Sequence, residues 1–204
     1  ICWWQGQLQE AEEIFREAAK ATADMRDLQT FNNAAEVLCQ LLLTESRLDE
    51  ALETAEWWLE TIGESREIHR DVYFVLATIC ARLGQVEKAQ DFAANYRQLV
   101  GSTAVGLFEG ADEQRMRAEL AVATGSWPEA NNAFKRLIAL QEQLEVRLYR
   151  AAALWDWALA LINKGAPEDI SEARKLAEEA EAEFIEMNLP YLIQKSKLLI
   201  QQLT

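Results

Sequence analysis

A short phrase recurs five times along the chain, and it constrains the fold more than any other feature. It consists of a small turn residue, a polar residue, an apolar residue, any residue, an acid or lysine, and alanine, as in GQLQEA at 6–11 and SRLDEA at 46–51. The closing alanines of the five copies are separated by 40, 38, 41 and 43 residues and are Ala11, Ala51, Ala89, Ala130 and Ala173. A period of this length indicates a repeat protein in which each repeat is one supersecondary unit.

Helical periodicity flanks each copy of the phrase. After Ala130, for example, apolar residues follow at Phe134, Leu137 and Ile138, which places them on one stripe of a helix. Before the later copies lie apolar helical stretches such as YFVLATICARL at 73–83. Between the paired helices stands a residue expected to take the left-handed conformation that ends a helix. These turn residues are Gly6, Ser46, Gly84, Gly125 and Gly165.

A single helical hairpin cannot bury its apolar face, whereas stacked neighbours bury it for each other. We therefore predict an all-α fold, a right-handed superhelical solenoid of about five helix–turn–helix hairpins. The prediction is one domain over 1–204 and a terminal capping helix at 189–204. The approximate repeats are 1–28, 29–66, 67–107, 108–144 and 145–188. The Gly-rich segment 101–110 predicts a longer loop between repeats, and the opening at Ile1 suggests a piece of a longer protein.

Small residues recur where paired helices must cross closely. One set is the closing alanines, and the other lies in the preceding helices at Cys39, Ala77, Ala118 and Ala158. A bulky side chain there would separate the helices at a cost of about 1–3 kcal/mol per site. We expect all of these positions to be buried.

The charge balance restricts the possible partners. Lys and Arg number 20 against 34 Asp and Glu, a formal net charge of −14, so a phosphate backbone or an anionic membrane surface would be repelled. The acidity belongs either to a solvated convex face or to a surface for a cationic partner. No apolar stretch is long enough to span a bilayer, and we expect no signal peptide. Three cysteines do not make a disulfide framework, so we expect a cytoplasmic protein.

The second half of each repeat resembles the tetratricopeptide repeat (TPR). The matching series are Gly6-Leu8-Ala11-Phe15-Ala18, Gly84-Val86-Ala89 and Gly125-Trp127-Ala130-Phe134. The first half is looser, with Ala35, Leu38, Cys39 and Leu42 or Tyr73, Leu76, Ala77 and Cys80 at the family's Trp, Leu, Gly and Tyr positions. A period near 40 instead of about 34, without the usual Pro, implies longer helices. In this respect the chain is similar to the sensor regions of MalT-type bacterial regulators and related ATPases and cyclases.

The resemblance implies a concave surface lined by the first helix of each pair. The family's groove positions fall on Asn33, Glu36, Gln40, Asp71, Phe74, Thr78, Arg82, Asp112, Arg115, Glu119, Trp155 and Leu159. Such a mixed, mildly acidic trough suits an extended or helical peptide with apolar anchors and some positive charge. The implied function is a protein or peptide interaction scaffold, whose partner can be another domain of the same polypeptide. The alternative is an effector-sensing regulatory domain of a MalT-like regulator or signalling ATPase or cyclase.

Nothing in the sequence indicates an enzyme. No phosphate-binding glycine loop, zinc-binding His pair or calcium loop is present, and the single His69 has no partner at metal-ligand spacing. We expect no catalytic residue, no cofactor and no metal. Adjacent helical residues point about 100° apart, so each tryptophan pair should divide between core and surface. We expect Trp58 and Trp157 in the core, and Trp57 and Trp155 nearer the surface, where exposed tryptophans or the N-terminal edge could support a homodimer.

Overall fold

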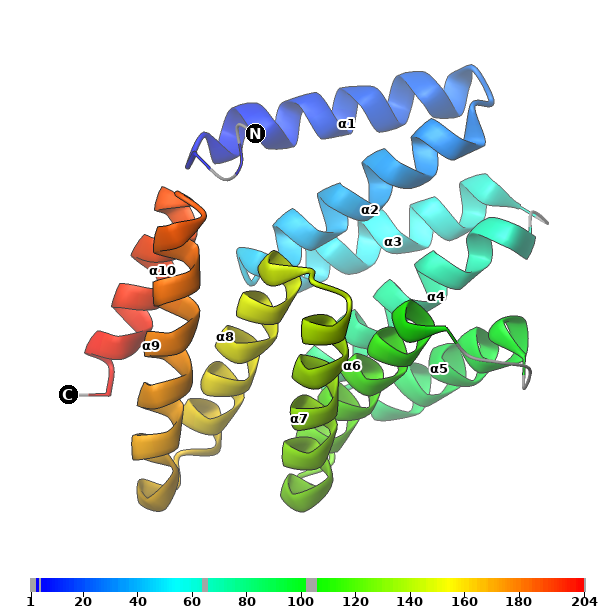
Figure 1. Cartoon of the computed structure of the whole chain (residues 1–204). Coiled ribbons are helices and arrows are strands. Elements are labelled where there is room, and N and C mark those ends of the chain that lie inside the picture. Colours follow the sequence, from blue (N-terminus) through cyan, green and yellow to red (C-terminus); the bar gives the residue numbers. More distant parts are fainter. Residues whose placement is uncertain (1–2, 4, 64–65, 102–105, 204) are drawn as a thin grey trace. The chain divides into compact units, whose positions relative to one another are not determined.

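The computed structural model describes residues 3, 5–63, 66–101 and 106–203. These residues form ten α-helices and one short 3₁₀ turn, and no strand occurs among them, which confirms the all-α prediction. Figure 1 shows the helices in chain order. They are α1 (Leu8–Asp24), α2 (Leu28–Thr44), α3 (Leu48–Ile62), α4 (Arg66–Arg82), α5 (Val86–Val100), α6 (Leu107–Ala123), α7 (Trp127–Gln143), α8 (Arg147–Lys164), α9 (Ile170–Glu186) and α10 (Pro190–Gln201).

Left-handed turn residues join the helices of each hairpin, as the sequence predicts. Ser46, Gly84, Gly125 and Gly165 have φ angles of 59°, 71°, 72° and 70°. At Gly84 the backbone N–H bonds back to Ala81 O at 3.0 Å, and the next N–H, of Gln85, bonds to Cys80 O at 2.8 Å. This is the Schellman arrangement, which satisfies carbonyls that a helix end otherwise leaves unpaired.

Residues other than glycine end several helices between repeats, and no pattern in the sequence predicts them. Arg26, Glu145 and Asn188 take φ angles of 57°, 58° and 54°. The hydrogen bonds at Arg26 match those at Gly84, with Arg26 N donating to Ala23 O at 3.1 Å and Asp27 N to Thr22 O at 3.0 Å. These turn hydrogen bonds therefore form with Arg26 in the left-handed conformation, which residues other than glycine rarely adopt.

The loop predicted at 101–110 is shorter than expected. Helix α6 already begins at Leu107, so the last four residues of that segment are helical, while 102–105 lie outside the described residues. The predicted C-terminal helix is present as α10. Within the described part of the chain, no helix is both long enough and apolar enough to cross a membrane.

The chain divides into two compact units. One comprises 8–105 with 119–126, and we call it the N-terminal unit; the other is built mainly from 106–118 and 127–204, and we call it the C-terminal unit. Helix α6 contributes to both. The single domain of five repeats remains a prediction.

Each unit has a core of large apolar side chains. In the N-terminal unit Phe31, Leu38, Trp58 and Leu76 are at most 1% exposed. In the C-terminal unit the Phe134 and Trp157 rings stack in parallel with centroids 5.8 Å apart.

The tryptophans divide between core and surface as predicted. Trp58 and Trp157 are 0% and 5% exposed, whereas Trp57 is 36% exposed and Trp155 is half-buried. In the first pair Trp3 is buried, and Trp4 lies outside the described residues.

The predicted crossing positions are confirmed as buried. All nine are at most 2% exposed, namely Ala11, Ala51, Ala89, Ala130, Ala173, Cys39, Ala77, Ala118 and Ala158. At one crossing α2 and α3 approach so closely that Cys39 Sγ lies 3.9 Å from Ala51 O. Burial raises the pKa of the Cys39 and Cys80 thiols, so both behave as small apolar side chains. Cys2 lies outside the described residues.

Candidate partner-binding surface

The twelve predicted groove residues lie on four helices, each the first of its hairpin. Asn33, Glu36 and Gln40 are on α2; Asp71, Phe74, Thr78 and Arg82 on α4; Asp112, Arg115 and Glu119 on α6; and Trp155 and Leu159 on α8. They recur every three or four residues within a helix, which places those of each helix along one side. We call these sides the first-helix surface.

Two polar pairs join first helices within the N-terminal unit. Asn32 Nδ2 on α2 donates to Asp71 Oδ2 on α4 at 3.2 Å. Arg82 on α4 donates to Glu119 Oε1 on α6 from Nε at 3.0 Å and from Nη2 at 2.5 Å. The Arg82 and Glu119 side chains are 18% and 8% exposed, so this ion pair is shielded from water.

Two further contacts in the C-terminal unit join α8 to the first helix α6 and to the C-terminal helix α10. Arg115 Nη2 on α6 donates to Asp156 Oδ2 on α8. Lys195 Nζ on α10 lies 5.7 Å from the centroid of the Trp155 ring on α8, a cation–π contact.

All four pairs connect residues about one repeat apart. The separations are 39 for Asn32–Asp71, 37 for Arg82–Glu119 and 41 for Arg115–Asp156, and 40 for Trp155–Lys195 by residue number. Side chains of successive first helices from α2 to α8 are therefore in direct contact within each unit, and α10 contacts α8 in the same way. Sequence reasoning found one or both members of every pair and missed Asn32, Asp156 and Lys195. Opposite charges one period apart were the signal that could have found Asp156.

The other predicted residues differ in what they offer a partner. Asn33 is exposed, and Gln40 Nε2 donates to Glu36 Oε1 at 3.0 Å within α2. The half-buried Phe74 ring lies against Tyr96 with centroids 6.4 Å apart. Thr78 is 2% exposed and donates its hydroxyl to Phe74 O, so its side chain is part of the helix packing.

The last two of the twelve predicted positions are only partly exposed to solvent. Asp112 on α6 and Leu159 on α8 are both half-buried. The first-helix surface is thus mostly self-paired, and Asn33 on α2 is its one exposed residue among the twelve predicted positions.

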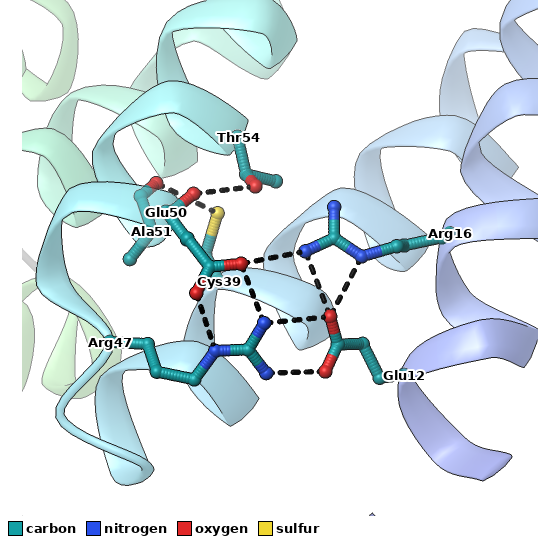
Figure 2. A network of polar contacts seen from close by, with 7 residues as sticks. All are labelled: Glu12, Arg16, Cys39, Arg47, Glu50, Ala51 and Thr54. Carbon is teal, nitrogen blue, oxygen red and sulfur yellow. Dashed lines mark hydrogen bonds and ion pairs between the residues drawn. The ribbon is translucent and has the colours of Figure 1, made fainter. Parts of the chain in front are cut away.

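A four-residue charge network lies away from this surface, on the second helices of the N-terminal unit. Figure 2 shows the Arg47 guanidinium between the carboxylates of Glu12 and Glu50. Arg47 Nη1 is 2.5 Å from Glu12 Oε2, and Arg47 Nη2 is 2.6 Å from Glu50 Oε2. Arg16 Nη2 joins from α1, 2.8 Å from Glu12 and 3.6 Å from Glu50. The network ties α1 to the start of α3.

The electrostatics of this network are those of a structural ion pair. The hydrogen bond from Arg47 lowers the pKa of Glu12 below its ordinary value, against the opposing effect of burial. The same guanidinium lowers the pKa of Glu50. Both carboxylates are held in the charged form, whereas a carboxyl that serves as a general acid needs a raised pKa.

Candidate catalytic and metal-binding groups are dispersed. In the described ranges, no three His, Cys, Asp or Glu side chains come together in a way that could hold a metal ion. The His69 ring stacks on Tyr73 with centroids 5.6 Å apart and an interplanar angle of 15°. The absence of a catalytic or metal site in the whole chain stays a prediction.

Comparison with known proteins shows the fold. No protein-family model and no curated protein matches the chain. The crystal structure of BtubC (BKLC) from P. vanneervenii is similar, with a TM-score of 0.53 at 16% identity, over 98% of this chain and 82% of that chain. A Podosopora anserina protein assigned as a kinesin light chain, with nearly identical TPR-like repeats, has a TM-score of 0.51 at 20% identity over 90% of both chains. The chain therefore has a TPR-like helical repeat fold, and its likeness to MalT-type sensors remains an expectation.

Proposed function

We propose that the chain is a non-catalytic interaction scaffold that binds a protein or peptide segment through its first-helix surface. The observation that carries this proposal is the set of polar pairs between successive first helices. Because these pairs hold neighbouring first helices side by side within each unit, side chains from different repeats can contact one extended ligand. Helical surfaces of this kind recognise peptides by spaced anchor residues. The partner can be another protein or another domain of the same polypeptide.

The N-terminal unit offers the clearest candidate for contact with a partner. Asn33 is exposed, Glu36 brings a negative charge, and Phe74 presents a half-buried aromatic ring. We infer a peptide with an apolar anchor and at least one positive charge. The net charge of −14 disfavours nucleic acid and an anionic membrane as partners of this chain.

The test is a peptide selection followed by mapping of the binding surface. Random peptides displayed on phage are selected against the immobilised chain, and the tightest one is synthesised. Amide hydrogen exchange is then measured with and without that peptide. We expect added protection in α2 and α4, and a tenfold or larger loss of affinity in the Asn33→Ala, Glu36→Ala double variant.

The matched control is the Asn95→Ala, Gln98→Ala double variant, because both residues are exposed on α5, a second helix. This variant should bind with unchanged affinity. Protection confined to α3 and α5, or equal losses in the two double variants, would contradict the proposal. A small metabolite that raises the melting temperature while no selected peptide protects α2 would instead support effector sensing.

A further inference from the structure

A buried oxygen atom at the contact between α2 and α4 has no hydrogen-bond donor within the described part of the chain. Asn32 on α2 is 4% exposed, and its Nδ2 donates to Asp71 Oδ2 on α4 at 3.2 Å. The other polar atom of this amide, Asn32 Oδ1, is buried and unpaired among the described residues. Buried polar groups are almost always hydrogen-bonded, so Asn32 Oδ1 is an acceptor that a bound ligand can satisfy. We call this contact the α2–α4 junction.

The next two contacts between first helices differ from the α2–α4 junction in their charges. Arg82 on α4 donates to Glu119 on α6, and Arg115 on α6 donates to Asp156 on α8. The chain itself therefore supplies a cation at each of these contacts. Arg115 stands three residues before the small crossing residue of its helix, and the residue at this position of α2 is Glu36. Where a later contact has its arginine, the α2–α4 junction thus has an acid.

The side chains placed around the Asn32 amide give this junction a negative charge. The Asp71 side chain is 29% exposed, so a ligand reaches it from solvent. Glu36 lies one helical turn from Asn32 on the same side of α2, and its Oε1 accepts a hydrogen bond from Gln40 Nε2 at 3.0 Å. Arg70 Nε is 3.1 Å from Asp71 Oδ1, but the Arg70 side chain is 42% exposed, which makes this ion pair weak. The charge balance of these groups favours a cationic ligand.

The hydrogen bonds of Asp71 favour lysine over arginine as that ligand. One Asp71 oxygen accepts from Asn32 Nδ2, and the other accepts from Arg70 Nε. A guanidinium binds a carboxylate most strongly through two parallel hydrogen bonds, and these existing contacts obstruct that arrangement. An ammonium group has three separate donors, which can reach single oxygen atoms of different side chains. A lysine side chain therefore fits the junction better than an arginine.

We propose that the α2–α4 junction binds a lysine side chain of the partner. Its ammonium group donates to Asn32 Oδ1 and lies between the carboxylates of Asp71 and Glu36. The terminal torsion of an asparagine is broad, so the Asn32 amide can turn Oδ1 toward the exposed Asp71 carboxylate, where the ammonium enters. This inference rests on the proposed function and deepens it, because it names the side chain that supplies the positive charge of the peptide.

The experiment titrates the whole 204-residue chain with three blocked amino acids and follows binding by nuclear magnetic resonance. They are the N-acetyl methylamides of lysine, arginine and norleucine, the last of which has the lysine stem without the ammonium group. Ionic strength is held constant throughout. We expect the lysine compound to shift the Asn32 side-chain amide signals to saturation, with a dissociation constant at least fivefold below that of the arginine compound. The norleucine compound should leave these signals unchanged.

Variants test whether the charge at the junction holds the lysine. Asp71→Asn keeps an oxygen for the Asn32 amide but removes the charge, and should weaken binding of the lysine compound fivefold or more. Arg70→Gln removes the competing cation and should strengthen that binding at least twofold. The matched control is the Glu53→Gln, Glu56→Gln double variant, because both carboxylates are exposed on α3, a second helix. It should bind the lysine compound with unchanged affinity.

Three results would overturn the proposal. They are equal affinity for the lysine and arginine compounds, signal shifts that never saturate, and equal weakening by Asp71→Asn and by the control variant. The peptide selected against the whole chain separates this proposal from the proposed function. If that peptide protects α2 and α4 but keeps its affinity when norleucine replaces its lysines, this proposal fails alone. If the lysine compound binds as expected but no selected peptide protects α2, the proposed function fails alone.

Discussion

The hairpin crossings and the first-helix surface differ in how strictly the residue type is conserved from one repeat of this chain to the next. At the crossings the four hairpins from α2 to α9 use one solution, a buried small residue on each helix, as at Cys39 and Ala51. On the first-helix surface the chemistry varies between junctions, with an amide and a carboxylate at Asn32–Asp71 but arginine–carboxylate ion pairs at Arg82–Glu119 and Arg115–Asp156. Close packing permits few side chains, whereas a polar contact between neighbouring helices can be made in several chemical ways.

The largest difference is expected between the two adjacent tryptophans of α3. Trp58→Ala removes a fully buried side chain and should lower the free energy of unfolding by about 3–5 kcal/mol. Trp57→Ala removes a ring that is 36% exposed and contacts Phe31 edge-on, so its effect should be much smaller. Urea unfolding followed by circular dichroism measures both.

A further variant sharpens this test. The Trp58 indole N–H finds no hydrogen-bond partner among the described residues, so Trp58→Phe should cost far less than Trp58→Ala. Equal losses for Trp57→Ala and Trp58→Ala would break the distinction between packed and open sides of α3.

Enlarging a crossing alanine should have the next largest effect. Ala51→Leu adds three carbons where Cys39 Sγ is 3.9 Å from the Ala51 carbonyl oxygen, and should lower the free energy of unfolding by about 1–3 kcal/mol. Ala94→Leu is the matched control, because Ala94 is exposed on α5. If both variants have the same midpoint in urea, the crossings are not the sites of tight packing.

The smallest effect is expected in the charge network, and it depends on pH. Glu12→Gln should cost about 0.2–1 kcal/mol near neutral pH, the range of partly exposed ion pairs. The pKa of Glu12 is lower in the folded state than its ordinary 4.5, so its contribution is present above that value and is lost as pH falls through the folded-state pKa. The difference between wild type and Glu12→Gln in thermal unfolding should therefore shrink below pH 4.5.

Glu53→Gln is the control for that titration, because Glu53 is an exposed carboxylate on α3. It should have little effect at any pH. A Glu12→Gln loss that grows with acidification would have the wrong sign for a carboxylate with a lowered pKa and would contradict the assigned network.

Sequence reasoning predicted packing better than polar contacts. The repeat period and the recurring alanines were enough to predict the hairpins and the buried crossings. Helices that pack closely leave room only for small side chains at the crossing, so these residues recur at fixed positions in the sequence. The left-handed Arg26 and Glu145 were missed, since their conformation comes from turn hydrogen bonds and not from residue type. The groove positions were placed on the expected helices, yet their mutual pairing was not foreseen, because it depends on the register between repeats. Their role in partner binding remains a prediction.

A charge exchange at Arg82 and Glu119 tests most directly whether successive first helices are in contact one repeat apart. Free energies of unfolding are measured for Arg82→Glu, Glu119→Arg and the double exchange. Each single variant places like charges together and should be destabilised, while the double exchange should recover most of the loss. A double exchange whose loss equals the sum of the two single losses would show that α4 and α6 are not in contact at this register, and would contradict the repeat architecture proposed for this chain.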